Sequence, residues 1–239
     1  VNADITSTGD ITITATDDAT DGRADDDNIT IAGGVTVQSS GGNININAGD
    51  DFSLANGSTL SANGPIIINI DSGNADASGG TATVSGDLTS GTGATINGDS
   101  DADTFDVTPS MMATIDLVGG NPTMAPGDTV NFMTPAGQSV AFTPDGADSG
   151  TFSTSGGFQD VTFDEIEAIG FAGDSLIVNS GGNDDLFDVT LTGADSGTLA
   201  LTTDVDAMPG PSAMINIMFS GLERLVANGE GGDDVPRDA

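Results

Sequence analysis

The chain has 239 residues, of which 37 are Asp or Glu and 3 are Arg, so its formal net charge is −34. It contains no Lys, His, Cys, Trp or Tyr. The absence of His and Cys excludes thiol chemistry, the usual zinc ligand sets and a Ser-His-Asp triad. A surface this acidic repels the phosphates of nucleic acids and anionic lipids, and no apolar run approaches the ~20 residues of a membrane span. We therefore expect neither a nucleic-acid partner nor membrane insertion.

The hydrophobic pattern predicts a folded all-β chain rather than a disordered one. High net charge with few aromatic residues is typical of disorder. However, 36% of the residues are hydrophobic, and Ile, Val and Leu alternate with polar residues in short runs bounded by Gly, Asn and Asp. This alternation is the pattern of half-buried strands. The expected strands of the first part are residues 11–14, 28–31, 35–37, 43–46, 52–54, 66–70 and 81–84.

An approximate repeat in residues 1–95 favours a β-solenoid. Asn28-Ile-Thr-Ile recurs after 15 residues as Asn43-Ile-Asn-Ile, and Pro65-Ile-Ile-Ile-Asn follows after 22 more. A drifting period of this size suits the coils of a right-handed parallel β-helix, whose stacked neighbours supply the core. An antiparallel β-sandwich with tight hairpins is the alternative, because it explains the Asn-Gly turns equally well.

Residues 96–239 are predicted to form a second region of duplicated β units with acidic loops. The loop in residues 96–107 has a second copy in residues 178–189 and an imperfect third copy in residues 227–236. Gly146–Thr151 recurs as Gly193–Thr198, and Phe163–Ile169 recurs in related form as Phe219–Leu225.

The acidic loops are candidate calcium sites. The acid consists of 33 Asp and only 4 Glu, and Asp suits both turns and rigid oxygen cages for hard cations. Asp99, Asp101 and Asp103 alternate in one tight loop behind Asn97, so their oxygens can converge on one cation; a solvated acidic turn is the alternative. The other predicted calcium ligands are Asn183, Asp184 and Asp185 in the second copy, Glu230, Asp233 and Asp234 in the third, and Asp17, Asp18, Asp21, Asp25 and Asp27 in the densest acidic run.

Several other residues are expected to have ordinary roles. The acidic run at residues 17–27 has an alternative reading as a loop with Arg23 as its internal counterion. Asp50, Asp51, Asp71 and Asp76 are expected to be turn residues. Met111, Met112, Met214, Met218 and the ten Phe are expected to fill the core.

The acidic loops resemble the Gly-Gly-x-Gly-x-Asp calcium repeats of RTX-type secreted proteins. Asp103 followed by Phe105, and Asp185 followed by Phe187, fit that pattern, whereas Pro236 replaces the aromatic residue in the third copy. The second region also resembles repeats of very large secreted bacterial surface proteins, and residues 1–95 resemble the coils of filamentous-haemagglutinin-like adhesins. The resemblance implies an extracellular, repetitive, calcium-loaded structural or adhesive protein.

The expected function is a calcium-stabilised structural repeat of an extracellular fibre or giant surface protein. Because Val1 is not an initiator Met, we expect either a processed chain or, in preference, a segment of a longer one. No capping segment is evident in the sequence, so we expect copies to run head to tail, joined covalently or by strand donation. A calcium-dependent adhesin that binds a surface or a glycan is the alternative, although the chain lacks the Trp and Tyr that favour such binding. An enzyme is not expected, since no Lys or His is present to act as a base.

Overall fold

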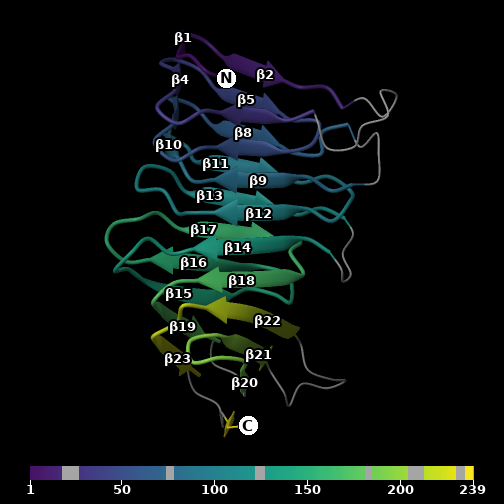
Figure 1. Cartoon of the computed structure of the whole chain (residues 1–239), viewed down its shortest axis with the longest axis vertical. Helices are drawn as coiled ribbons and strands as arrows, with labels where there is room; N and C mark the ends of the chain where they lie inside the picture. The colour runs from purple at the N-terminus through teal and green to yellow at the C-terminus, as the bar shows by residue number, and fades with distance from the viewer. Residues whose placement is uncertain are drawn as a thin grey trace.

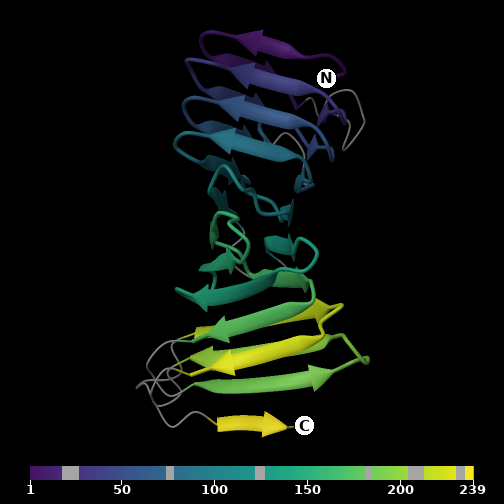
Figure 2. The same ribbon diagram turned by 90° about the vertical axis from the view of Figure 1, so that its left-hand side faces the viewer.

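The protein is all-β. The structure, a computed structural model, describes residues 1–17, 27–73, 78–121, 127–180, 185–203, 213–229 and 235–238, and these residues contain strands, turns and bends but no helix. The strands stack in layers along the long axis of the molecule, with the N-terminus at one end and the C-terminus at the other (Figures 1 and 2).

The described strands form three sheets, which we call sheets A, B and C. Sheet A has the order β1 (Ile5–Ser7), β4 (Thr36–Ser39), β7 (Thr59–Ala62) and β10 (Asp87–Ser90). Sheet B has the order β2 (Ile11–Thr14), β5 (Ile44–Asn47), β8 (Ile66–Asn69), β11 (Ala94–Asn97), β13 (Ile115–Val118), β17 (Val161–Asp164), β16 (Gly150–Thr154), β15 (Ser139–Pro144), β19 (Ser175–Asn179) and β23 (Arg224–Asn228). Sheet C has the order β24 (Val235–Asp238), β20 (Leu186–Leu191), β21 (Gly197–Thr203), β22 (Ala213–Ser220), β18 (Ala168–Ala172), β14 (Thr129–Met133), β12 (Thr104–Val107), β9 (Thr81–Val84), β6 (Phe52–Leu54) and β3 (Ile29–Ile31).

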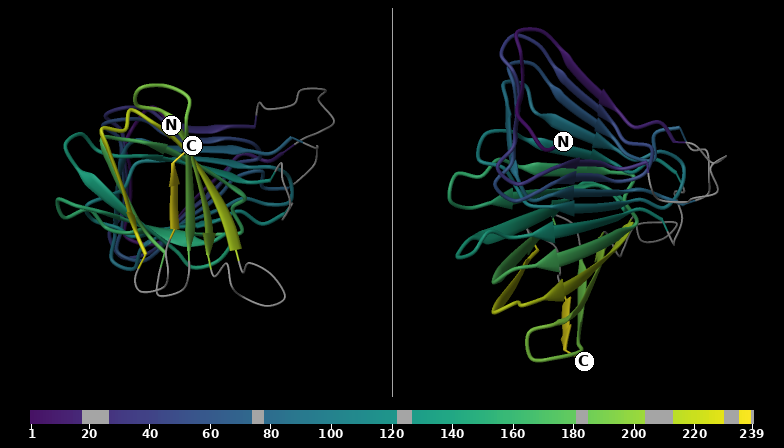
Figure 3. Two further views of the ribbon diagram at one scale, coloured as in Figure 1. Left: turned by 90° about the horizontal axis from the view of Figure 1, so that it is seen from below. Right: turned by 45° about the horizontal axis from the view of Figure 1, so that its top comes forward.

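The first part of the chain visits the sheets in turn and returns to each one layer further along. Strands β1 to β14 pair only in parallel, so the antiparallel hairpins of the sandwich alternative are absent there. Figure 3 shows these layers along and obliquely to the long axis. The register places Asn47 opposite Asn69, 22 residues on, and Asn69 opposite Asn97, 28 residues on.

The predicted 15-residue spacing is wrong as a layer repeat. Asn28-Ile-Thr-Ile leads into β3 of sheet C, whereas Asn43-Ile-Asn-Ile forms β5 of sheet B. The two similar segments therefore occupy different sheets. The 22-residue step from Asn43 to Pro65 does correspond to one layer, because β5 pairs with β8.

Alternate side chains of the strands point inward and form columns of apolar residues. In sheet B, Ile46, Ile68, Ile96, Leu117 and Phe163 follow one another in register, and all are buried. Removing an aliphatic side chain from water contributes roughly 1.5–3 kcal/mol, so each added layer extends the core.

Aromatic rings fill the core of the layers that follow. The Phe132 and Phe152 rings stack at 4.5 Å between centroids, and Phe142 lies 5.1 Å from Phe152. Nine of the ten Phe are buried as expected, and Phe158 is half-buried.

The sequence duplication in the second region is a duplication of structure. Strands β15, β16 and β17 form an antiparallel run in sheet B, and β20, β21 and β22 form the same run in sheet C. The repeated Gly-Ala-Asp-Ser-Gly-Thr segment is the hairpin turn in both. In each copy the Asp carbonyl of this turn accepts a 2.9 Å hydrogen bond from the N–H of a buried apolar residue: Asp148 from Ile166, and Asp195 from Leu222.

Sheets B and C continue through the proposed boundary at residue 95. Strand β11 pairs with β8 on one side and β13 on the other, and β12 pairs with β9. The division into regions 1–95 and 96–239 remains a prediction.

Candidate functional site: the acidic edge

The predicted calcium loops all belong to one type of connection. Each leads from a strand of sheet B to the next strand of sheet C: β2 to β3, β11 to β12, β19 to β20, and β23 to β24. The connections β5–β6, β8–β9, β13–β14 and β17–β18 are of the same type. We call these eight connections the acidic edge. Carboxylates that are distant in sequence therefore become neighbours in successive layers.

Carboxylates along this edge form a ladder of hydrogen bonds with the backbone. Oδ2 of Asp50 accepts a hydrogen bond from the N–H of Asp27 at 2.6 Å. Oδ1 of Asp103 accepts from the N–H of Gly80 at 2.6 Å, and Oδ1 of Asp128 accepts from the N–H of Asp103 at 2.7 Å. Oε2 of Glu167 in turn accepts from the N–H of Asp128 at 2.7 Å. Each of these carboxylates thus satisfies a backbone donor that belongs to the preceding layer.

Three carboxyl groups of the edge have raised pKa values. Burial, reinforced by the charges of Asp103, Asp101, Asp99 and Asp17, raises the pKa of Asp71 to about 7. Burial also raises the pKa of Asp103 to about 7, against the opposing effect of its two backbone hydrogen bonds.

The third carboxyl group is that of Asp128. Burial raises its pKa to about 6, with smaller contributions from the charges of Glu167 and Glu165. The ionised forms of all three groups are therefore costly unless a cation compensates them.

Some carboxylate oxygens of the acidic edge have no hydrogen-bond partner. Oδ2 of Asp71, Oδ2 of Asp128 and Oε1 of Glu167 are buried and unpartnered. Asp71 and Asp128 are 1% and 0% exposed. Asp50 and Asp71 do lie in bends between strands, as predicted, but they are not ordinary turn residues, because both side chains are buried. Asp71 also adopts a left-handed backbone conformation with φ of 49°. Oδ1 of Asp51 accepts a hydrogen bond from the N–H of Thr81, 30 residues away, at 2.8 Å, so Asp51 also links successive layers. Asp76 lies outside the described residues.

The first predicted loop is only partly brought together. Oδ2 of Asp103 accepts a hydrogen bond from the N–H of Asp99 at 3.0 Å, so these residues close the loop. Asp99 is exposed and Asp101 is half-buried. Asn97 belongs to a separate asparagine ladder, in which its Nδ2 donates to Oδ1 of Asn69 at 2.8 Å.

The other predicted ligands are described in part. Asp27 lies on the carboxylate ladder, Asp17 lies beside Gly73, and Asp185 is buried and accepts a 2.5 Å hydrogen bond from Ser180 Oγ. Asp18, Asp21, Asp25, Asn183, Asp184, Glu230, Asp233 and Asp234 lie outside the described residues. Within the described ranges, no three His, Cys, Asp or Glu side chains converge closely enough to hold a metal ion. Calcium binding therefore stays a prediction.

Sequence reasoning missed the carboxylates of Asp128 and Glu167. They are 39 residues apart, yet the acidic edge makes them neighbours. A usable signal was their position: both immediately precede a strand of sheet C, as Asp103 does.

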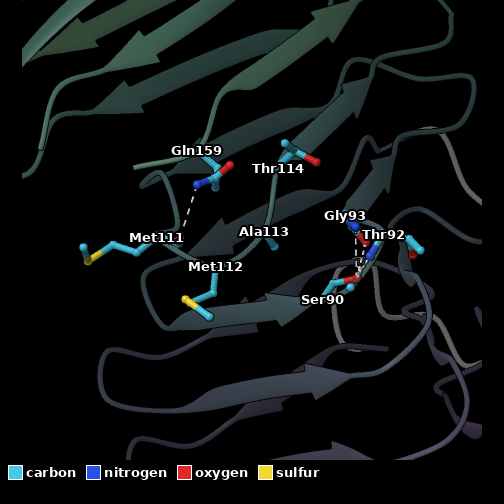
Figure 4. A pocket seen from close by; sticks show the side chains of 9 residues that line it. Ser90, Thr92, Gly93, Met111, Met112, Ala113, Thr114 and Gln159 are labelled. Carbon is cyan, nitrogen blue, oxygen red and sulfur yellow. Dashed lines mark hydrogen bonds between the residues drawn. The ribbon is translucent and has the colours of Figure 1, made fainter. Parts of the chain in front are cut away.

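Two methionines form an exposed feature elsewhere, where sheet A ends. Met111 and Met112 are 55% and 63% exposed, so their expected place in the core is wrong, as it is for Met218 at 53%. The side chain of Met214 lies outside the described part. Met111 and Met112 line a pocket of about 530 Å³ together with Ser90, Gln159 and residues next to them in the chain (Figure 4). The only pairing of this segment with β10 is an isolated bridge between Met112 and Thr89.

No protein-family model, curated protein or solved structure matches the chain. Among the described residues, no helix has the length and apolar character needed to cross a membrane.

Proposed function

We propose that the chain is a calcium-stabilised structural repeat of an extracellular bacterial fibre or giant surface protein. In this proposal the stacked parallel layers form a right-handed β-solenoid, and the hairpin units of the second region continue it. The parallel pairing of β1 to β14 and the right-handed preference of parallel crossovers support this architecture. The observation that carries the function is the acidic edge, because all four predicted calcium loops connect a strand of sheet B to the next strand of sheet C.

The electrostatics of the edge support a role for cations. Asp71, Asp103 and Asp128 are buried, and the groups that shift their pKa values by charge are other carboxylates. Arg224 in β23 is the only Lys or Arg side chain that the structure describes. Calcium ions bound only by the folded chain each add RT ln(1 + [Ca]/Kd), about 2.7 kcal/mol at a hundredfold excess over Kd. They also reduce the repulsion among 34 net charges.

Head-to-tail association of copies is part of the proposal. In the described part of the chain, β1, β2 and β3 each have a partner strand on one side only. An open strand edge is a template for pairing with another chain. Sedimentation velocity in millimolar calcium tests this point: we expect oligomers, and a strictly monomeric sample would contradict association.

Thermal unfolding with and without calcium tests the function itself. We expect the melting temperature in millimolar calcium at pH 7.5 to exceed that in chelator by well over ten degrees, because several sites act together. Magnesium at the same concentration serves as the control for ionic strength and nonspecific screening. Equal melting temperatures in calcium and in chelator would contradict the proposal that calcium stabilises the fold.

An adhesin is the second candidate, and the Met111–Met112 feature favours it. An exposed apolar pair beside a pocket offers a contact area on a strongly acidic protein. Binding to immobilised glycans and to hydrophobic surfaces, compared with the double variant M111S/M112S, tests this candidate. Undiminished binding by the variant would exclude the methionines as the contact.

A further inference from the structure

We infer that Asp128 and Glu167, with the carbonyl oxygen of Glu165, form a further calcium site at the β13–β14 and β17–β18 connections. The inference rests on the proposed function, since it takes calcium to be the stabilising cation, but it concerns residues outside the predicted loops. It is carried by two buried carboxylate oxygens without a hydrogen-bond partner, on two residues that a hydrogen bond holds side by side.

The carboxylate of Asp128 has one satisfied and one free oxygen. Oδ1 accepts the N–H of Asp103 at 2.7 Å. Oδ2 is buried without a hydrogen-bond partner, although the residue is 0% exposed. An ionised oxygen in such a place costs several kcal/mol unless a donor or a cation meets it.

Gly119 shows where the free oxygen points. A Cβ atom built on Gly119 would overlap the carbonyl oxygen of Glu165 and lie 2.5 Å from Oδ2 of Asp128. The two oxygens therefore both lie against Gly119, at the position that the side chain of any other residue would occupy. Backbone carbonyls and carboxylates are the usual protein ligands of calcium.

Glu167 supplies the second carboxylate. Its Oε2 accepts the N–H of Asp128 at 2.7 Å, which holds the carboxylate beside that residue. Its Oε1 is buried and unpartnered, although the residue as a whole is half-buried. Two carboxylates and one carbonyl leave room for water ligands, as calcium requires 6–8 oxygens.

The competing explanation is a neutral acid. A protonated Asp128 could donate from Oδ2 to the Glu165 carbonyl and would need no cation. Asp128→Asn reproduces that neutral state, because its amide can still accept at Oδ1 and can donate toward the Glu165 carbonyl. The variant therefore removes the calcium ligand without leaving a buried charge.

Calorimetric titration of calcium chloride into the chelator-treated full chain at pH 7.5, with parallel melting curves, tests the site. We expect Asp128→Asn to bind one calcium ion fewer than the wild type, to gain less in melting temperature from calcium, and to melt no lower in chelator. Asp116→Asn is the matched control, because it also removes one negative charge, but from an exposed residue. Oδ1 of Asp116 accepts a hydrogen bond from Thr162 Oγ1 at 2.8 Å, which the Asn amide oxygen can still accept. We expect this variant to bind as many calcium ions as the wild type.

The site would be overturned if Asp128→Asn bound as many calcium ions as the wild type and gained as much in melting temperature from calcium. If this variant does not fold, Glu167→Gln takes its place, because its amide oxygen can still accept from Asp128; full calcium binding by that variant would likewise overturn the site. A wild type indifferent to calcium defeats the proposed function together with the site. The site alone is defeated if the wild type binds calcium, the D99N/D101N variant binds fewer calcium ions, and Asp128→Asn binds as many as the wild type. The proposed function then stands.

Discussion

The backbone N–H of Asp103 donates a 2.7 Å hydrogen bond to Oδ1 of Asp128, 25 residues further along the chain. Both side chains are buried, so one acidic residue anchors the next in the adjacent layer. The relationship repeats between Asp128 and Glu167. A fold built this way accumulates negative charge on one edge, and its stability should therefore depend on pH, on cations and on the backbone donors that the ladder satisfies.

Calcium-free stability should fall as the pH rises from about 4 to about 7. Burial raises the pKa of Asp71 and of Asp103 from 3.8 to about 7, and that of Asp128 to about 6. In this interval the folded chain holds protons that the unfolded chain has released, so raising the pH favours unfolding. Melting temperatures in calcium-free buffer from pH 4 to pH 8 measure the effect.

The variant Asp103→Asn separates the buried group from the general repulsion of the chain. We expect it to flatten the pH profile, whereas the exposed-site variant Asp116→Asn should leave it nearly unchanged. If the melting temperature of the wild type rose with pH instead, the buried carboxyl groups would not have raised pKa values in the folded chain.

The asparagine ladder should affect stability but not calcium binding. Asn69 accepts from Nδ2 of Asn97 and donates to Oδ1 of Asn47, both at 2.8 Å. Asn69→Ala removes both hydrogen bonds and should cost about 1–3 kcal/mol of unfolding free energy. Asn97→Ala removes one and should cost about half as much. Denaturant unfolding gives these values; if Asn97→Ala alone lost the stabilisation by calcium, Asn97 would be a metal ligand.

The duplicated turns provide a matched test of backbone strain. Glu165 has φ of 59°, and Gly221 has φ of 70° at the equivalent place in the second copy. Left-handed conformation costs an ordinary residue roughly 1–2 kcal/mol, whereas glycine adopts it freely. Glu165→Gly should therefore stabilise the protein by about 1 kcal/mol, and Gly221→Ala should destabilise it by a similar amount. Chemical denaturation of both variants measures this, and destabilisation by Glu165→Gly would show that the two turns are not equivalent.

The aromatic core should be sensitive to truncation. Phe152 is fully buried, and its ring lies 4.5 Å from that of Phe132 and 5.5 Å from that of Phe163. Phe152→Ala should lower the unfolding free energy by about 3–5 kcal/mol. Phe158→Ala, at the half-buried aromatic residue, is the control and should cost much less. Similar losses in the two variants would mean that Phe152 does not lie in the main core.

Apolar alternation predicted the strands better than it predicted their layer assignment. Ile11–Thr14, Phe52–Leu54 and Thr81–Val84 are strands with the expected bounds. Strands β7 and β10 were missed, because Thr59–Ala62 and Asp87–Ser90 each contain little beyond a single Leu to mark an apolar face. Similar strands in sheets B and C share a local pattern, so the sequence alone could not assign them to a sheet.

The candidate site was predictable only where the acids lie close in sequence. The run around Asp99 is visible as a motif, but the ladder joins residues 25 and 39 positions apart. Its hydrogen bonds depend on the number of residues in each layer, which varies along the chain. The methionines were misplaced for a related reason: nothing in their hydrophobicity shows that sheet A ends beside them.

The central claim is that cations occupy the acidic edge, and an anomalous difference map from a terbium-soaked crystal tests it most directly, since terbium replaces calcium and scatters anomalously. We predict peaks along the connections from sheet B to sheet C, including one beside Asp128, Glu167 and the Glu165 carbonyl, that disappear when excess calcium is added. A map without peaks along that edge, or with peaks that calcium does not displace, would contradict the account.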